Sequence, residues 1–232
     1  MTATPSLEPQ SQSVQKMFAG IALRYDLANH LLSGGLDFLW RRRAAQWVKN
    51  WNPERLLDLA TGSGDLALTL GAACPKTRIF GADFCYPMLK VAQDKGLGNL
   101  VTADGLRLPF ASQTFDVVTV AFGLRNMASW VGAAREMGRV LRPGGHLLIL
   151  DFSIPRPPLR WAYRPYLHHV LPKVAGWVTG EPEAYEYLGD SIEKFPHGKA
   201  MEALLVEAGL TAPTSEPLTG GIVSLYTAKV PE

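Results

Sequence analysis

The chain has 232 residues, of which 47% are hydrophobic and 19% charged, and its formal net charge is +2. This length suits one domain with a substantial core, and the balanced charge gives no reason to predict nucleic-acid binding. The two cysteines form neither a metal-binding spacing nor a disulfide framework, and no apolar run reaches the ~18 residues of a membrane span. Residues 1–16 lack the basic start and apolar core of a secretory signal, so we expect a disordered tail on a cytoplasmic protein.

Residues 17–50 have a helical pattern that is interrupted at Ser33-Gly34-Gly35, and we expect them to form a lid. The side chains that can share one apolar helix face are Leu36, Leu39, Trp40, Trp47 and Val48. On this pattern Arg41, Arg42 and Arg43 are predicted to be more exposed.

From residue 55 onward, apolar strands alternate with helices. The strands are predicted at 55–60, 78–84, 99–104, 114–124 and 146–152, and the helices at 65–74, 86–96 and 130–142, the last stopped by Pro143-Gly144-Gly145. Strands that are apolar almost throughout, separated by helices, are typical of a parallel sheet covered on both faces.

The alternation stops after the fifth strand, and residues 154–197 are expected to form a helical insertion on the substrate side. A helix is predicted at 199–210, and the two prolines within 211–219 permit only an edge strand there. The following Gly220-Gly221 pair predicts a two-residue turn into an antiparallel strand that closes the sheet.

The segment LLDLATGSGDLALTL, residues 56–70, predicts a strand, a tight turn and the start of a helix. A dinucleotide-binding turn would carry a third glycine three residues after Gly64, but the next glycine is Gly71. Asp65 would also place negative charge at the helix N-terminus, where a pyrophosphate should bind. Both features argue against a nicotinamide dinucleotide.

S-adenosylmethionine suits this turn better, because it has no phosphate and carries a sulfonium and an ammonium group. Asp58 and Asp65 would then be favourable partners for its positive charges. Asp83, at the end of the second strand, can accept hydrogen bonds from both ribose hydroxyls, and Asp104 with Gly105 can reach the adenine edge. Each acid alone could be a helix cap or a loop residue, but their order and spacing together favour this cofactor.

The stretches RYDLANHLLSGG, LLDLATGSGDLA, FGLRN and LTGGIVSLYTA resemble class I S-adenosylmethionine-dependent methyltransferases, and more narrowly the demethylmenaquinone and polyprenyl-benzoquinol C-methyltransferase family. The resemblance covers residues 17 to 229 and implies a single α/β domain over 17–232. Its Rossmann-like, seven-stranded sheet would be mostly parallel with an antiparallel C-terminal hairpin, a helical N-terminal lid and a helical insertion after strand five. The cofactor contacts that the resemblance implies are Gly62, Ser63, Gly64, Asp83, Asp104, Gly105 and Ala121. Ala121 stands where many relatives have serine, so a contact there must come from its backbone.

The resemblance also implies methylation of a ring carbon of a prenylated quinol, and we expect conversion of demethylmenaquinol to menaquinol, the last step of menaquinone biosynthesis. A benzoquinol of ubiquinone biosynthesis or another small molecule are the alternatives, and a nicotinamide-dependent oxidoreductase is disfavoured. A ring carbon becomes nucleophilic when a neighbouring hydroxyl loses its proton, so the substrate should be the reduced quinol. Arg125 and Asn126, after the fourth strand, and Tyr25 in the lid are the catalytic candidates. The alternative for Arg125 is an ion pair with the insertion, and for Tyr25 a packing role.

Aromatic side chains gather in the insertion, interleaved with arginines. The aromatic residues are Trp161, Tyr163, Tyr166, Trp177, Tyr185 and Tyr187. They could line a channel for an isoprenoid tail, meet anionic lipid at the inner membrane face, or simply cover the core. Peripheral membrane contact and a homodimer are both compatible with this sequence.

Overall fold

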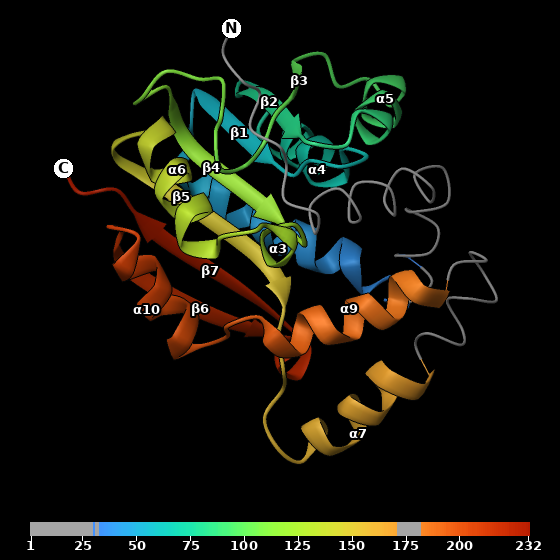
Figure 1. Cartoon of the computed structure of the whole chain (residues 1–232). Coiled ribbons are helices and arrows are strands. Elements are labelled where there is room, and N and C mark those ends of the chain that lie inside the picture. Colours follow the sequence, from blue (N-terminus) through green and yellow to red (C-terminus); the bar gives the residue numbers. More distant parts are fainter. Residues whose placement is uncertain (1–29, 31–32, 171–181) are drawn as a thin grey trace, which may run out of the picture.

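The computed structural model describes residues 30, 33–170 and 182–232, which contain a seven-stranded sheet with helices on both faces (Figure 1). The strand order across the sheet is β3-β2-β1-β4-β5-β7-β6. The strands are β1 (Arg55–Leu59), β2 (Arg78–Asp83), β3 (Leu100–Thr102), β4 (Phe115–Ala121), β5 (Leu141–Phe152), β6 (Thr211–Leu218) and β7 (Val223–Lys229). The predicted tail, residues 1–16, lies outside the described residues.

The first five strands run parallel and β7 lies antiparallel between β5 and β6, so the predicted sheet is confirmed. The register pairs Leu57 with Val118 and Asp58 with Thr119, at the centre of the sheet. The proline-bearing β6 lies at the edge, where a missing N–H leaves no neighbouring strand unsatisfied.

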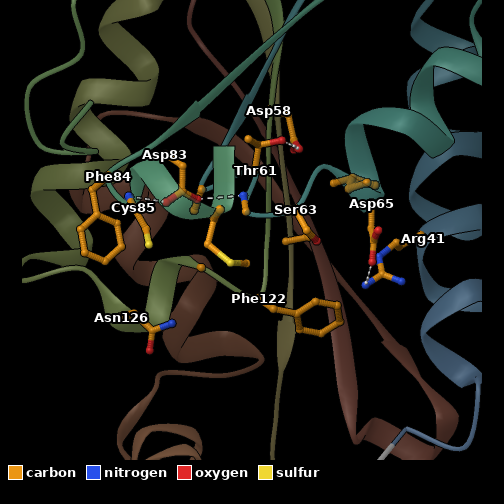
Figure 2. Close-up of a pocket in the computed structure, with 16 residues that line it drawn as sticks. Arg41, Asp58, Thr61, Ser63, Asp65, Asp83, Phe84, Cys85, Phe122 and Asn126 are labelled. Atoms are coloured by element: carbon orange, nitrogen blue, oxygen red, sulfur yellow. Dashed lines mark hydrogen bonds and ion pairs between the residues drawn. The ribbon is translucent and has the colours of Figure 1, made fainter. Parts of the chain in front are cut away.

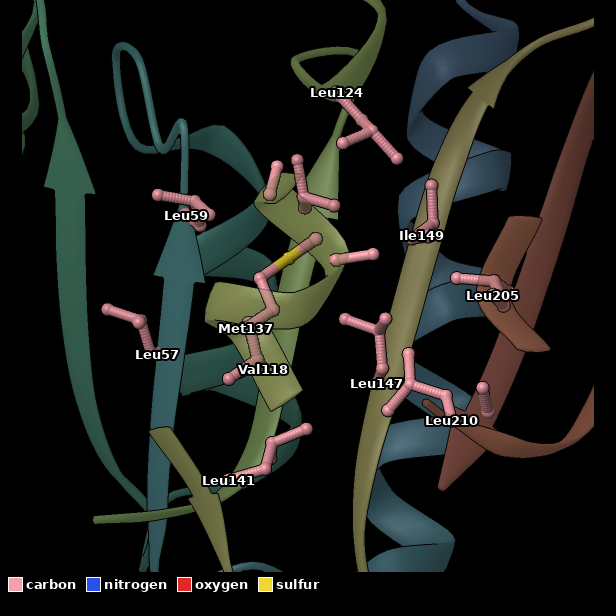
Figure 3. Packing of buried hydrophobic residues seen from close by; sticks show 14 of the residues in the cluster. Leu57, Leu59, Val118, Leu124, Met137, Leu141, Leu147, Ile149, Leu205 and Leu210 are labelled. Carbon is pink, nitrogen blue, oxygen red and sulfur yellow. The ribbon is translucent and has the colours of Figure 1, made fainter. Parts of the chain in front are cut away.

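Two groups of helices cover the sheet. On one face are α3 (Leu36–Trp51), α4 (Asp65–Ala73) and α5 (Tyr86–Asp94), and on the other are α6 (Trp130–Val140) and α10 (Lys199–Glu207). Figure 3 shows the second interface, where Met137 and Leu205 pack against side chains of β4 and β5 such as Val118 and Leu147. Alternate residues of each strand therefore serve two cores, which explains why these strands are apolar throughout.

The predicted apolar face of α3 is partly wrong. Trp40 and Val48 are buried as expected, but Leu39 is 56% exposed and Arg41 is only 6% exposed. Residues 37, 41 and 45 continue the buried stripe of the helix at four-residue spacing, and Leu39 lies off it. Arg41 can occupy this stripe because acidic partners meet its guanidinium group.

Two turns also differ from their predictions. The helix predicted to stop at Pro143-Gly144-Gly145 ends at Val140, and β5 begins at Leu141, which pairs with Phe115. The Pro143-Gly144-Gly145 segment is a bulge within this strand, where Gly144 has a φ of +72°. The hairpin turn is longer than two residues, because a 3-10 turn (Thr219–Gly221) and residue 222 connect β6 to β7.

The insertion after β5 is helical, as predicted. It contains α7 (Leu159–Pro165), a π-helical turn (Tyr166–Val170) and α9 (Pro182–Lys194). These segments lie at the end of the sheet where β4 and β5 finish (Figure 1). None of the helices in the described part of the chain has the length and apolar character needed to cross a membrane.

Candidate active site

A cavity lies at the carboxyl ends of β1, β2 and β4. Between β1 and β4 the order of the strands changes direction, since β2 and β3 follow on one side and β5 on the other. Open parallel sheets bind their ligands at such a reversal. The lining residues are Arg41, Asp58, Ala60, Thr61, Gly62, Ser63, Asp65, Leu66, Asp83, Phe84, Cys85, Met88, Ala121, Phe122, Gly123 and Asn126. The predicted cofactor residues Gly62, Ser63, Asp83 and Ala121 are therefore in one place.

The turn between β1 and α4 has a left-handed backbone at its glycines. Gly62 has a φ of +54° and Gly64 a φ of +87°. The φ of Gly64 is one that L side chains rarely adopt, and a Cβ atom there would also lie 2.3 Å from Cδ1 of Leu97 and 3.2 Å from Cβ of Ala92, so glycine is favoured at the start of α4. Gly64 is absent from the cavity lining, and its contribution is to shape the turn.

Asp83 connects the turn after β1 with the turn after β2. Its Oδ2 accepts a hydrogen bond from the backbone N–H of Gly62 and its Oδ1 accepts one from that of Cys85, each at 2.8 Å (Figure 2). Burial raises the pKa of Asp83, and the backbone N–H groups of Cys85, Gly62 and Phe84 act against that rise. A carboxylate has about four lone-pair sites, so Asp83 can still accept a hydrogen bond from the ribose.

A second hollow continues from Asp83 and is lined largely by apolar groups, among them Leu106 and Met127. Asp104 and Gly105 border it, as predicted for an adenine site. Asp104 is exposed, and its Oδ1 accepts the N–H of Leu106 at 2.9 Å, which leaves its other oxygen available for a ligand donor. The planar, weakly polar adenine fits this end of the cavity.

Asp58 lines the cavity and also has a structural role that was not predicted. It is 1% exposed, and its two oxygens accept hydrogen bonds from the hydroxyls of Thr61, at 2.7 Å, and Thr119, at 2.6 Å. Burial raises the pKa of Asp58 to about 6. These bonds tie the turn to β1 and β4, so Asp58 holds the turn in shape.

Asp65 is paired with two protein cations. Its Oδ1 lies 2.7 Å from Nζ of Lys95, and its Oδ2 lies 3.3 Å from Nη2 of Arg41. The expected pairing of Asp65 with ligand cations alone is therefore incomplete. Four further residues line the cavity and were not predicted: Phe84, Cys85, Met88 and Phe122. For Phe84, Cys85 and Phe122, the position directly after β2 or β4 was the available signal.

Arg125 lies in a short 3-10 turn (Leu124–Asn126) after β4, and its side chain is 5% exposed. Its Nη1 donates to Oδ1 of Asp151 at 2.8 Å and to the carbonyl of Phe122. The ion-pair partner is thus on β5, not in the insertion. Nε of Arg125 and Oδ2 of Asp151 are both buried without a hydrogen-bond partner among the described residues.

Asn126 lines both hollows of the cavity. Its Oδ1 accepts a hydrogen bond of 3.2 Å from the hydroxyl of Tyr187, on the insertion helix α9. Asn126 therefore connects the cofactor side with the insertion. Tyr25, the third catalytic candidate, lies outside the described residues.

This arrangement fits S-adenosylmethionine: a weakly polar hollow for adenine, a buried carboxylate for ribose, and a charged end beside Asp65. The fold and the site define an S-adenosylmethionine-dependent methyltransferase of class I. Its fold is similar to a SAM-dependent methyltransferase of Thermotoga maritima, described as a possible histamine N-methyltransferase, with a TM-score of 0.66 at 17% identity over 92% of this chain and 98% of that one.

Sequence comparison identifies the family. Residues 6–229 match the ubiE/COQ5 methyltransferase family. A demethylmenaquinone methyltransferase of Thermus thermophilus is 44% identical over 93% of this chain and 100% of the relative. A ubiquinone/menaquinone biosynthesis C-methyltransferase UbiE of Syntrophotalea carbinolica is 41% identical over 93% of each. The chain belongs to the ubiE/COQ5 methyltransferase family, and the predicted fold, cofactor and enzyme class are confirmed.

Replacing Asp83 tests the ribose site. Asp83→Ala should weaken binding of S-adenosylhomocysteine by about ten- to hundredfold, because hydrogen bonds to a charged group contribute about 1.5–3 kcal/mol. Titration calorimetry measures this loss. Asp94→Ala is the matched control, since Asp94 is an exposed acid at the end of α5. Equal affinity of the Asp83 variant and the wild type would remove Asp83 from the cofactor site.

Proposed function

We propose that this enzyme transfers a methyl group from S-adenosylmethionine to a ring carbon of reduced demethylmenaquinone, giving menaquinol. The observation that carries the proposal is the similarity, over the full length of the relative, to the Thermus protein whose name states this substrate. The UbiE relative carries both ubiquinone and menaquinone in its name, which supports a polyprenyl benzoquinol as a second substrate. The two substrates share a hydroquinone ring with a prenyl chain.

The chemistry requires electron density at the carbon that is methylated. When bound, the cofactor supplies an electrophilic methyl group on its sulfonium. The quinol becomes reactive when the hydroxyl next to the target carbon is deprotonated, because the phenolate charge spreads to that carbon. The protein must orient the ring, stabilise the developing anion and let the ring proton leave. An oxidised quinone has no such hydroxyl.

Asn126 and Arg125 are the residues that we propose for these tasks. Asn126 lines the cavity and can hold a quinol hydroxyl or a water through its amide, while Tyr187 fixes the orientation of that amide. Arg125 is buried directly before it and supplies a fixed positive charge that stabilises the phenolate or a water-borne base. Tyr25 stays a prediction for the lid side of the site.

The redox state of the substrate tests the function. With labelled S-adenosylmethionine, we expect methyl transfer to chemically reduced demethylmenaquinone and none to the oxidised form. A reduced polyprenyl benzoquinol is assayed beside it to compare the two ring systems. Transfer to the oxidised quinone, or to neither quinol, would contradict the proposed reaction.

Arg125→Lys tests the electrostatic role, since it retains a charge beside Asp151 but loses the guanidinium fork. We expect kcat to fall by about tenfold or more per folded molecule, and Arg125→Ala by about 10². Weaker stabilisation of the phenolate raises the pKa of the bound quinol, so the rise of kcat with pH should move to higher pH.

Stability is the control for this experiment. Arg125→Ala leaves Asp151 buried and unpaired, and losing one partner of a buried pair costs about 3–5 kcal/mol. Turnover must therefore be normalised to the folded fraction. A purely structural Arg125 would give variants with lower melting temperatures but the wild-type pH profile and kcat.

We also propose that α7 contacts the membrane surface that holds the prenylated substrate. Trp161 is 73% exposed and Leu159 is 39% exposed on this helix, and the exposed Arg156 and Arg164 flank them. An exposed tryptophan beside basic groups suits an anionic lipid surface. Tyr163 is buried and Tyr166 half-buried against it, so these two contribute to packing within the insertion; the side chains of Trp177 and Tyr185 lie outside the described part.

Trp161→Ala should lower binding to vesicles of anionic phospholipid by about tenfold, because burying a large apolar side chain contributes about 1.5–3 kcal/mol. Vesicle sedimentation measures the bound fraction. The control is Val206→Ala, which removes an apolar side chain that is 57% exposed on α10. Equal binding of both variants and the wild type would exclude α7 as the contact.

A further inference from the structure

Arg41 is the one cation among the described residues that line the two hollows of the cofactor site. It comes from α3, which forms the second half of the segment predicted as a lid, and its side chain is only 8% exposed. The helix places Arg41 opposite the start of α4, beside Asp65 (Figure 2). A buried cation in a ligand cavity calls for an anionic partner.

The protein partners of Arg41 use only part of its guanidinium group. Nη1 donates to Oδ2 of Asp37. Nη2 lies 3.3 Å from Oδ2 of Asp65, and Figure 2 shows these two side chains facing each other. Asp37 also accepts a hydrogen bond from Ser33 and contacts a ring nitrogen of His30, so Asp37 is fixed from several sides. A guanidinium has five N–H donors, and within the described residues one of them makes a hydrogen bond.

The two hollows define the direction of the cofactor. Adenine fits the weakly polar hollow beside Asp104 and Met127, and ribose lies at Asp83 between the hollows. The methionine part must then extend past Ser63 toward Arg41 and Asp65. This part of the cofactor ends in an α-ammonium and an α-carboxylate. At this end of the cavity, the carboxylate of Asp65 and the guanidinium of Arg41 lie side by side.

We infer that Arg41 binds the α-carboxylate of S-adenosylmethionine and that Asp65 accepts the neighbouring α-ammonium. This assignment rests on the methyltransferase function proposed above. The planar fork of Arg41 can donate two parallel hydrogen bonds to a carboxylate. Asp37 holds the guanidinium in place from the side away from the ligand, which makes Asp37 a positioning residue. The occupied carboxylate site also joins α3 to the cofactor.

Three ligands separate this role from a structural one. S-adenosylhomocysteine carries both amino-acid groups, its decarboxylated analogue retains the ammonium alone, and 5′-methylthioadenosine lacks both. Titration calorimetry on the whole protein should show that Arg41→Gln lowers the affinity for S-adenosylhomocysteine by about ten- to hundredfold. The affinities for the other two ligands should change by less than about twofold, since neither has a carboxylate.

Arg42→Gln is the matched control, because Arg42 is the exposed neighbour of Arg41 on α3, and its ligand affinities should equal those of the wild type. Equal losses for all three ligands, or no loss for any, would overturn the assignment. If Arg41→Gln does not fold, Arg41→Lys is measured instead. This variant retains the contact with Asp37 but loses the guanidinium fork. Its affinity for S-adenosylhomocysteine should therefore fall several-fold more than its affinity for the decarboxylated analogue, and equal losses would overturn the assignment.

The wild-type protein separates this inference from the proposed function. A wild type that binds none of the three ligands would argue against the proposed methyl transfer itself. A wild type that binds S-adenosylhomocysteine, together with an Arg41 variant that retains its preference for the carboxylate, would overturn the assignment of Arg41 alone.

Discussion

The carboxylate of Asp83 is the interaction on which the geometry of the site depends. It lies at the end of β2 and binds backbone N–H groups of two different turns, Gly62 after β1 and Cys85 before α5. A buried carboxylate needs hydrogen-bond donors, and the N–H groups of these two turns supply them, which holds both turns against Asp83. The ribose position, the glycine turn and the start of α5 are therefore fixed relative to one another by one side chain.

Acids around the cavity are compensated in two ways. Asp58 receives two threonine hydroxyls, whereas Asp65 and Asp37 meet Arg41 and Lys95. Asp58 and Asp37 are buried, but the side chain of Asp65 is 21% exposed and lines the cofactor cavity. Asp65 can therefore exchange a protein charge for a ligand charge.

The alternation of strands and helices, the glycine turn and the acids at the strand ends could be predicted from the sequence, because each depends on local residues and on the rule that the carboxyl ends of parallel strands share one edge. The burial of Arg41 could not, since it depends on Asp65, an acid 24 positions later in the chain. The same limit explains the early start of β5. Leu141 leaves the helix to pair with Phe115, a partner that no local pattern reveals.

The end of β4 connects the cofactor cavity to the insertion. Ala121 and Gly123 line the cofactor cavity, and Asn126, a few residues later, accepts a hydrogen bond from Tyr187 of α9. The buried Arg125–Asp151 pair ties the turn after β4 to the end of β5, from which the insertion departs. A change in the position of the insertion would therefore move Asn126 through both Tyr187 and this pair.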